Sequence, residues 1–386
     1  MLKKLALYAF LVAVVPLAIL EVAVRFLPVS SPPYLLPVSA QNPVPRFQPD
    51  LEYQYSWGPD FAVRSVKRSN NFGYNHFADY KAQDDSPLLM VIGDSFVEAQ
   101  AIDSGKSAAE LLHASLGGTG RVYSIGVSGA PLSQYLVFAQ YAAREFRPDA
   151  MAFFIISNDF DESLVQYKSE PRFHYFEEGP AGVRLRRVDY QLSAAKKLLR
   201  HSALLRYLMY NVAIEARLQA VLNPGSVAAW GSRDAEAPER LERRVRDSRR
   251  AVDHFLELLP RMSGLGAGSI AFVLDAVRPA IYTEQGLKDA EASYHERMRR
   301  YFAGRAKALG YEVVDLQPAF IARHRADGSR FEFPTDSHWN ELGNALVAEE
   351  LAKTPVFGRV FRSPELLRAT APKGLRRRAE RRARNP

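Results

Sequence analysis

Short apolar runs alternate with helix-like segments from Leu88 onward, and this alternation constrains the fold more than any other feature of the chain. Five runs have the length and composition of buried strands: 88–94, 121–127, 149–157, 269–277 and 311–316. Segments with helical character lie between or after them, at 105–116, 133–145, 296–310 and 341–353. Strands that alternate with helices form a parallel sheet covered on both faces, so the pattern predicts an α/β three-layer sandwich.

A long insertion, about residues 170–265, separates the third and fourth predicted strands. Its first part, 172–187, predicts a hairpin that turns at Gly179-Pro180-Ala181-Gly182. Two further segments, 193–219 and 238–262, have helical periodicity and mixed surface charge. We interpret the insertion as a helical addition to the same domain.

The N-terminus carries Lys3 and Lys4 ahead of an uncharged, largely apolar stretch from Leu5 to Leu20. Such a stretch is either a secretory signal or a membrane anchor. No small-x-small cleavage site lies close behind it, which favours an uncleaved anchor over residues 1–28. Glu21 and Arg25 lie one helical turn apart and are expected to pair. The N-terminal lysines predict a single pass through an inner membrane, with the catalytic domain in the periplasm or another extracytoplasmic space.

The remaining segments divide by composition. Residues 29–84 begin as a stalk rich in Pro, Ser and Val and continue as an aromatic-rich region, 51–80, that we expect to be irregular and to pack on the domain at 85–355. A basic tail, 356–386, follows. Its last part, 373–386, contributes +6 of the net charge of +8, so the body is nearly neutral and does not have the profile of a nucleic-acid-binding domain.

The tail is interpreted as solvated and disordered, and the alternative is a weak attraction to anionic lipid or polysaccharide. The chain has no cysteine, which excludes disulfides, thiol catalysis and cysteine-based metal sites. No cofactor or metal is predicted, because no dedicated ligand motif occurs.

Polar residues stand where the predicted strands end. The first three strands are followed, in order, by Ser95, the loop from Gly126 to Gly129, and Asn158. The segment 334–343 precedes the last helix. Each has a purely structural alternative, such as a helix cap for Ser95 or a turn for Asn158. Ligands of open parallel sheets bind beyond the carboxyl ends of the strands, however, and these residues converge there.

Together these residues fit nucleophilic catalysis by serine. A serine needs a base within hydrogen-bond reach, and His338 is the candidate base for Ser95. Asp336 lies two residues earlier, on the same face of an extended segment, and is the candidate acid that orients the imidazole. The backbone N–H groups of Ser95 and Gly129 and the amide of Asn158 are the candidate oxyanion donors.

The chain resembles the SGNH hydrolases of the GDSL-like lipase and esterase superfamily over about residues 88–353. "GDSF" at 93–96, Gly129 in "GVSGAP", Asn158 in "ISNDF" and "DSHWN" at 336–340 match the four blocks of that family in order. The resemblance implies an SGNH-like, flavodoxin-like fold. The family's commonest spacing is Asp-x-x-His, whereas this chain has Asp-x-His with Thr335 at the usual acid position. The tighter spacing resembles membrane-anchored relatives, including exopolysaccharide O-acetylation proteins.

Three functions remain open at this stage. The first is a serine ester hydrolase that removes an acyl group, in our preference an O-acetyl group, from an extracytoplasmic glycan or lipid through an acyl-enzyme. The second is an O-acetyltransferase of a cell-surface polysaccharide with the same triad. The third is a non-catalytic glycan-assembly protein on the same fold. The expected partners are a small-molecule or glycan ester, the membrane through the N-terminal helix, and cell-surface polysaccharide machinery.

Overall fold

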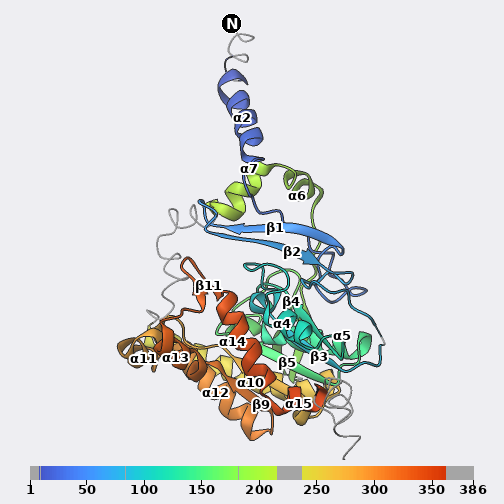
Figure 1. Ribbon diagram of the computed structural model, residues 1–386, viewed down its shortest axis with the longest axis vertical. Coiled ribbons are helices and arrows are strands. Elements are labelled where there is room, and N and C mark those ends of the chain that lie inside the picture. Colours follow the sequence, from blue (N-terminus) through green and yellow to red (C-terminus); the bar gives the residue numbers. More distant parts are fainter. Residues whose placement is uncertain (1–7, 9, 83, 181, 215–236, 362–386) are drawn as a thin grey trace, which may run out of the picture.

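The computed structural model describes residues 8, 10–82, 84–180, 182–214 and 237–361. At its centre lies a parallel sheet with the strand order β4-β3-β5-β8-β9 (Figure 1). The strands are β3 (Leu88–Gly93), β4 (Arg121–Gly126), β5 (Ala150–Ile155), β8 (Ile270–Leu274) and β9 (Glu312–Asp315). All five strands predicted from the sequence are present, and the predicted α/β sandwich with a parallel sheet is confirmed.

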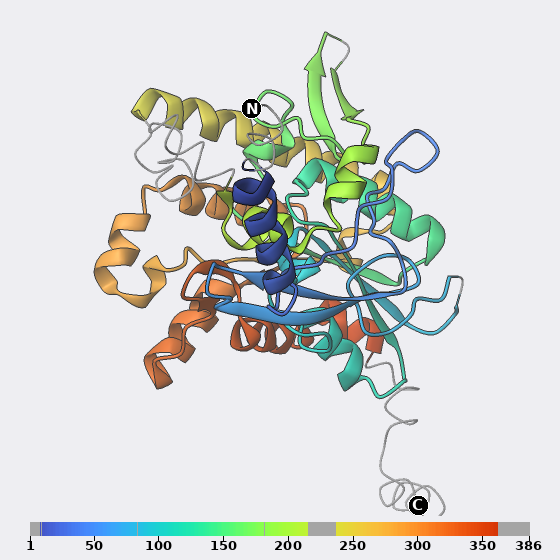
Figure 2. The ribbon, with the colours of Figure 1, turned by 90° about the horizontal axis from the view of Figure 1, so that it is seen from above.

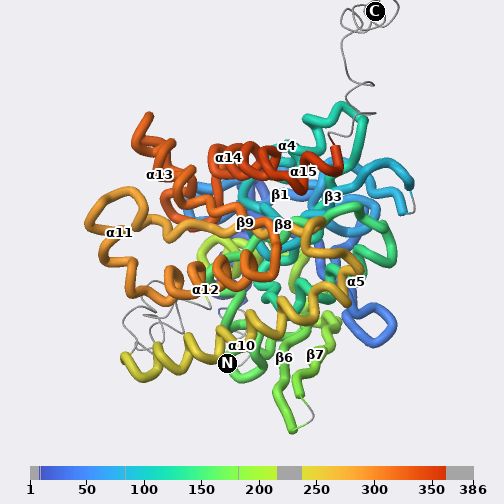
Figure 3. Tube along the Cα trace, turned by 90° about the horizontal axis from the view of Figure 1, so that it is seen from below, coloured from blue at the N-terminus to red at the C-terminus, as the bar shows by residue number. Residues whose placement is uncertain are grey.

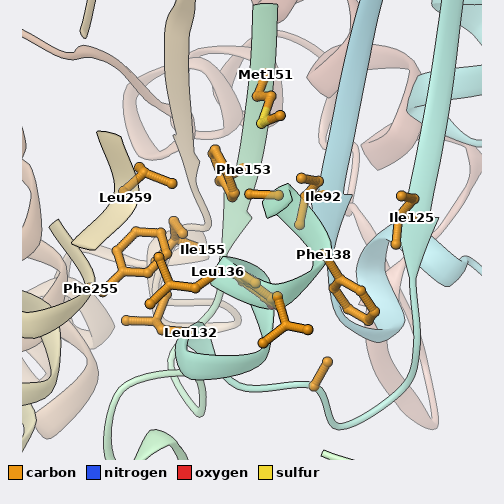
Figure 4. Packing of buried hydrophobic residues seen from close by; sticks show 14 of the residues in the cluster. Ile92, Ile125, Leu132, Leu136, Phe138, Met151, Phe153, Ile155, Phe255 and Leu259 are labelled. Atoms are coloured by element: carbon orange, nitrogen blue, oxygen red, sulfur yellow. The ribbon is translucent and has the colours of Figure 1, made fainter. Parts of the chain in front are cut away.

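Helices cover both faces of the sheet, which explains why the three central strands, β3, β5 and β8, are apolar throughout. On one face lie α5 (Leu132–Glu145), α10 (Pro238–Ser263) and α12 (Tyr294–Ala308), and on the other lie α4 (Ala108–Ser115), α13 (Leu316–Asp327), α14 (Glu341–Ala352) and α15 (Pro355–Phe361) (Figure 3). Alternate residues of β3 point to the two faces: Met90 and Ile92 pack in the first layer, Leu89 and Val91 in the second. Figure 4 shows the first layer, where Phe255 and Leu259 of α10 meet the sheet.

The insertion is part of the same packed body, since α10 contributes to the main core. Its hairpin, β6 (His174–Gly179) paired with β7 (Gly182–Arg187), turns where the sequence predicts, although Ala181 lies outside the described residues. The predicted helix at 193–219 is different in the structure. It is broken into α6 (Ala194–Leu199), α7 (Ala203–Arg206) and a π-helical turn, η3 (Tyr207–Asn211). The break occurs because the Ser202 hydroxyl accepts the Leu205 N–H at 3.1 Å and starts a new helix; residues 215–219 lie outside the described part.

The aromatic-rich region that we expected to be irregular contains an antiparallel hairpin, β1 (Leu51–Trp57) with β2 (Val63–Ser69). Along β2 the inward side chains include Ser65 and Lys67, both buried. Ser65 donates a hydrogen bond to the Gln100 carbonyl, and Lys67 lies 3.8 Å from the buried carboxylate of Glu110. Polar residues on the buried face hide the apolar alternation by which a strand is recognised, so the sequence pattern missed this hairpin.

At the N-terminus, the helical turn η1 (Phe10–Val14) and α2 (Val15–Val24) project from the body above β1 and β2 (Figures 1 and 2). Glu21 and Arg25 form the expected ion pair, with 2.9 Å between Oε1 and Nη2. Among the described residues, no helix has both the length and the apolar character required to cross a bilayer. Lys3 and Lys4 lie outside the described residues, and the anchor stays a prediction.

At the other end of the chain, α15 packs on the core through Val356, Phe357, Val360 and Phe361. The packed body therefore extends to Phe361, a few residues beyond the position 355 at which the sequence analysis ended the domain. The basic segment 373–386 lies outside the described residues.

Candidate active site

Ser95 stands directly beyond the carboxyl end of β3, as the first residue of the short helix α3 (Ser95–Glu98). Asp94 caps this helix by accepting the Phe96 N–H at 3.0 Å, so the capping role that the sequence left open for Ser95 belongs to its neighbour. From Leu88 to Ala99, Ser95 is the only residue that is not buried. Its hydroxyl donates to Asp94 Oδ2 at 3.4 Å. The chain thus leaves Ser95 half-buried just beyond the end of a fully buried strand.

A glycine in the neighbouring strand makes this position possible. At Gly126, the last residue of β4, a Cβ atom would lie 2.6 Å from the backbone nitrogen of Glu98. Any larger residue there would therefore force α3 away from the sheet, and Ser95 with it.

Ser95 and His338 line the same small cavity, with a volume of about 40 Å³. Four further residues with polar side chains contribute to its wall: Tyr55 of the β1–β2 hairpin, Gln100, Ser128 and Asn344. The rest of the wall is mostly apolar and includes Phe96, Ala99, Ala101, Ile102 and Trp339. The fold therefore brings the candidate nucleophile and the candidate base, far apart in the sequence, to one cavity.

Asp336 and His338 lie on β11 (Asp336–Trp339), which pairs with β10 (Glu332–Phe333). The Oδ1 atom of Asp336 is 2.5 Å from His338 Nδ1, and it also accepts the His338 backbone N–H at 3.0 Å. Both side chains are half-buried, whereas Thr335 between Pro334 and Asp336 is exposed. The bond to Nδ1 leaves Nε2 as the imidazole nitrogen that can serve a nucleophile.

The pair also sets the proton affinity of both groups. Burial alone would raise the pKa of Asp336, but the hydrogen bond and charge of His338 outweigh it and hold that pKa below its usual value. Burial would likewise lower the pKa of His338, but the bond to Asp336 and the negative charge of that carboxylate raise it above 6.5. The site therefore stabilises the protonated form of His338 relative to a free imidazole, and this is the form that arises when the base takes up a proton.

Arg278, which the sequence analysis did not single out, holds the β10–β11 segment in place. Its guanidinium donates to the carbonyl of Ser337 at 3.0 Å, between Asp336 and His338. The same group bonds Asp275 at 2.7 Å, and Asp275 in turn accepts the indole N–H of Trp339 at 2.9 Å. Arg278 and Asp275 follow the fourth strand, but nothing in the local sequence indicates a partner about 60 residues away.

The loops after β4 and β5 flank Ser95, because β3 lies between these two strands. Gly129 has φ +80°, a left-handed conformation that favours glycine. The Lys168 ammonium donates to the Gly129 carbonyl at 3.0 Å and lies 2.6 Å from Glu162 Oε2. Asn158 Nδ2 approaches the same Glu162 oxygen at 3.5 Å. The Lys168–Glu162 ion pair, which the sequence analysis did not single out, thus joins two of the three candidate oxyanion residues, Gly129 and Asn158.

A buried carboxylate braces the Gly129 loop from the other side. Glu98 Oε2 accepts both the backbone N–H and the hydroxyl of Ser128 at 2.5 Å. Burial raises the pKa of Glu98. The Glu98 carbonyl accepts the side-chain amide of Asn75, whose own carbonyl accepts the Tyr53 hydroxyl at 2.9 Å. The N-terminal hairpin therefore takes part in building the site, and the only sequence signal for this was the aromatic content of 51–80.

In the part of the chain that the structure describes, no group of three or more His, Asp or Glu side chains is placed to hold a metal ion.

Comparisons with known proteins agree with this site over part of the chain. Residues 236–357 match the model of a family described as "SGNH hydrolase-like domain, acetyltransferase AlgX". The match includes Asp336 and His338 but not Ser95, Gly129 or Asn158. It confirms the resemblance to SGNH hydrolases and to acetylation proteins that the motifs indicated. No curated protein matches the chain by sequence.

Solved structures similar to this chain include a lipolytic protein of the G-D-S-L family from Veillonella parvula, which is 11% identical with a TM-score of 0.37 and covers 69% of this chain and 97% of its own. A lipase/acylhydrolase from Enterococcus faecalis is 12% identical, with a TM-score of 0.38 and coverage of 71% and 97%. An acetyl xylan esterase, AlAXEase, is 11% identical, with a TM-score of 0.35 and coverage of 68% and 97%. These scores are too low to carry an inference about activity. The family match supports acyl-ester chemistry as the broad class.

Proposed function

We propose that the protein is a serine enzyme that cleaves an acyl ester through a covalent acyl-enzyme on Ser95. The observation that carries the proposal is that His338 is bonded to Asp336 at 2.5 Å and lines the same cavity as the Ser95 hydroxyl. A nucleophile, a base and an orienting acid are the three parts that serine catalysis requires.

In the first half of the reaction, Ser95 Oγ attacks the acyl carbonyl carbon while His338 Nε2 takes the hydroxyl proton. Asp336 stabilises the imidazolium that results. As the tetrahedral intermediate collapses, His338 returns the proton to the leaving alcohol, and the acyl group stays on Ser95. A water molecule then attacks the acyl-enzyme, His338 takes its proton, and the acid and free Ser95 are released.

For the first step the Ser95 hydroxyl must turn from Asp94, to which it donates in the structure, towards His338. Catalytic hydrogen bonds often tighten only when substrate binds. Burial raises the pKa of Asp94 to about 6, so this group is still mostly a carboxylate at neutral pH, and substrate binding must supply the driving force that turns the hydroxyl away from it.

The negative charge on the attacked oxygen is stabilised by the backbone N–H groups of Ser95 and Gly129 and by the Asn158 amide. The Lys168–Glu162 pair supports this role, because it fixes the peptide of Gly129 and lies against the Asn158 amide. Donors placed before the reaction stabilise the transition state without having to reorganise during it.

The size of the cavity supports a small acyl group. A volume of about 40 Å³ is enough for a few water molecules, each of which needs about 10–15 Å³ on the same measure. An acetyl group fits such a space, and the apolar side chains of Ala99, Ala101 and Ile102 suit its methyl group. We therefore take O-acetyl as the acyl group, on an extracytoplasmic glycan or lipid. The exposed apolar side chains of α2 support that location, and the word acetyltransferase in the family description supports acetyl as the acyl group.

Transfer of the acetyl group to a sugar hydroxyl is the second candidate function, because an alcohol can replace water in the second half of the reaction. The family name in the match favours it. The test is to incubate the full-length protein with a chromogenic acetyl ester, with and without a cell-surface glycan, and to measure released acetate and glycan-bound acetyl by mass spectrometry. Glycan acetylation lost in Ser95→Ala indicates a transferase, and acetate release alone indicates a hydrolase. If neither product forms, the proposal of acetyl-ester cleavage is contradicted.

A further inference from the structure

The short helix α6 exposes every one of its residues in the part of the chain that the structure describes. Leu198 is 73% exposed and Leu199 52% exposed, side by side on a helix that has no buried face. At the nearby foot of α2, Phe26 is 85% exposed and Leu27 46% exposed. Arg25, next to Phe26, donates to the carbonyl of His201, two residues beyond Leu199, so the two exposed pairs lie on connected segments. Large exposed apolar side chains on neighbouring segments indicate a binding surface.

This surface is fixed to the N-terminal helix by a set of hydrogen bonds. The carboxylate of Glu21 on α2 accepts the Ser202 hydroxyl at 2.7 Å and the backbone N–H groups of Ala203 and Leu204 at 3.0 and 2.9 Å. Arg25 donates to the carbonyl of His201 at 3.3 Å. Glu21 thus caps α7 from another helix, and α6 is held at the foot of α2 (Figure 1).

Positive charge accompanies the apolar groups. Lys196 and Lys197 directly precede Leu198 and are exposed. Next along the chain, the Arg200 guanidinium bonds the Pro32 carbonyl and lies 5.0 Å from the centre of the Tyr34 ring. Leucines that enter the acyl region beside lysines that reach the headgroups are the composition of interfacial helices on anionic membranes.

We propose that α6, with Phe26 and Leu27, is a lipid-facing seat that holds the domain against an anionic bilayer. The proposal rests on the membrane attachment proposed above, since α2 projects from the same end of the molecule (Figure 1). A membrane suits this surface because the apolar rod of α2, where Val12 in the preceding η1 turn is 75% exposed, continues directly into it.

The seat is joined to the wall of the active-site cavity. Tyr207 of η3 donates to the Pro59 carbonyl at 3.1 Å, and Asn211 donates to the Ser56 hydroxyl at 2.9 Å. Both contacts are with the β1–β2 hairpin, which carries Tyr55 into the cavity. A seated α6 would therefore hold the cavity at a fixed height above the lipid, within reach of substrates at the membrane surface.

The absence of cysteine allows a direct test by single labelling. The full chain with Leu199→Cys, labelled with an environment-sensitive fluorophore, is reconstituted in nanodiscs of phosphatidylcholine and phosphatidylglycerol that contain nitroxide-labelled lipids. We expect strong quenching by the nitroxides. The matched control is Leu309→Cys, a 46% exposed leucine that follows α12 at the opposite end of the molecule and should not be quenched (Figure 1). Lys196→Gln combined with Lys197→Gln should reduce the quenching at position 199.

A third label, at Val12→Cys, separates the seat from the anchor. Quenching at position 12 without quenching at position 199 overturns the seat and leaves the anchor in place. Loss of quenching at both positions overturns both. A label at position 199 that is shielded from an aqueous quencher but not reached by nitroxide lipids would mean that protein covers α6, and it also overturns the proposal.

Discussion

The two walls of the active site are held in different ways. On the acid–base wall, Asp336 and His338 belong to one strand, bond each other at 2.5 Å, and are held by Arg278 through the carbonyl between them. On the oxyanion wall, Gly129 and Asn158 come from separate loops and are connected through the Lys168–Glu162 pair. The first wall is built by neighbours in sequence, and the second by contacts between loops.

This difference leads to different expectations for mutation. A substitution on the acid–base wall should remove a charge from a fixed geometry, so a single change should lower kcat strongly. A substitution on the oxyanion wall should remove or displace one of several hydrogen-bond donors, so each change should lower kcat less. The predictions below test this contrast.

The largest effect is expected for Asp336→Asn. Without the carboxylate, the imidazolium of His338 loses its partner and the imidazole loses its correct tautomer, so kcat should fall by about 10⁴-fold. The fold should survive, because the change removes no volume. Thr335→Ala is the control and should keep most of the activity, since Thr335 is exposed. Turnover of a chromogenic acetyl ester, with a thermal melt of each variant, checks this. Near-normal turnover in a folded Asp336→Asn protein would show that His338 works without this acid.

On the oxyanion wall, Asn158→Ala should lower kcat by about 10²- to 10³-fold and leave KM nearly unchanged. The amide is proposed to meet negative charge that exists only in the transition state, and one such donor contributes about 3–4 kcal/mol. Steady-state kinetics with the same ester measures both constants. A change confined to KM would mean that Asn158 only positions the substrate.

A smaller loss, about tenfold in kcat, is expected for Lys168→Met, because the Gly129 peptide loses its fixed position while each donor remains present. Lys353→Met is the control, since it removes an equally short ion pair on the surface, with 2.6 Å between Lys353 Nζ and Glu350 Oε1. Comparison of kcat, KM and melting temperature separates the two roles. If Lys168→Met melts earlier but keeps its kcat, the ion pair stabilises the fold and has no part in positioning Gly129.

The smallest effect is expected in the unmodified protein, as a shift of the pH at which kcat/KM reaches half its plateau. His338 must be neutral to accept the serine proton, and its pKa is raised above 6.5 by Asp336 against the opposing effect of burial. Below that pKa the imidazole is already protonated, so kcat/KM should rise with pH and reach half its plateau above pH 6.5. A half-point clearly below 6.5 would mean that Asp336 does not stabilise the protonated imidazole.

The same contrast explains what could be predicted from the sequence. The five strands follow from local periodicity, and so does the placement of Asp336 and His338 on one face of an extended segment. The structure shows the five strands and the hydrogen bond between the two side chains. Lys168, Glu162 and Arg278 act through contacts with distant residues and carry no local signal. The β1–β2 hairpin was missed because its buried face includes Ser65 and Lys67, and Tyr55 was missed with it. The break of the helix at 193–219 depends on Ser202 as a cap, which a periodicity argument passes over.

The account rests most of all on Ser95 as the nucleophile, and covalent labelling tests this most directly. The full-length protein is treated with a fluorophosphonate, digested, and the modified residue is located by mass spectrometry, with Ser128→Ala and Ser95→Ala proteins in parallel. We predict a single adduct on Ser95, retained in Ser128→Ala and absent from Ser95→Ala. The account would be contradicted if the folded protein gave no adduct, or if the adduct lay on Ser128 or on any residue other than Ser95.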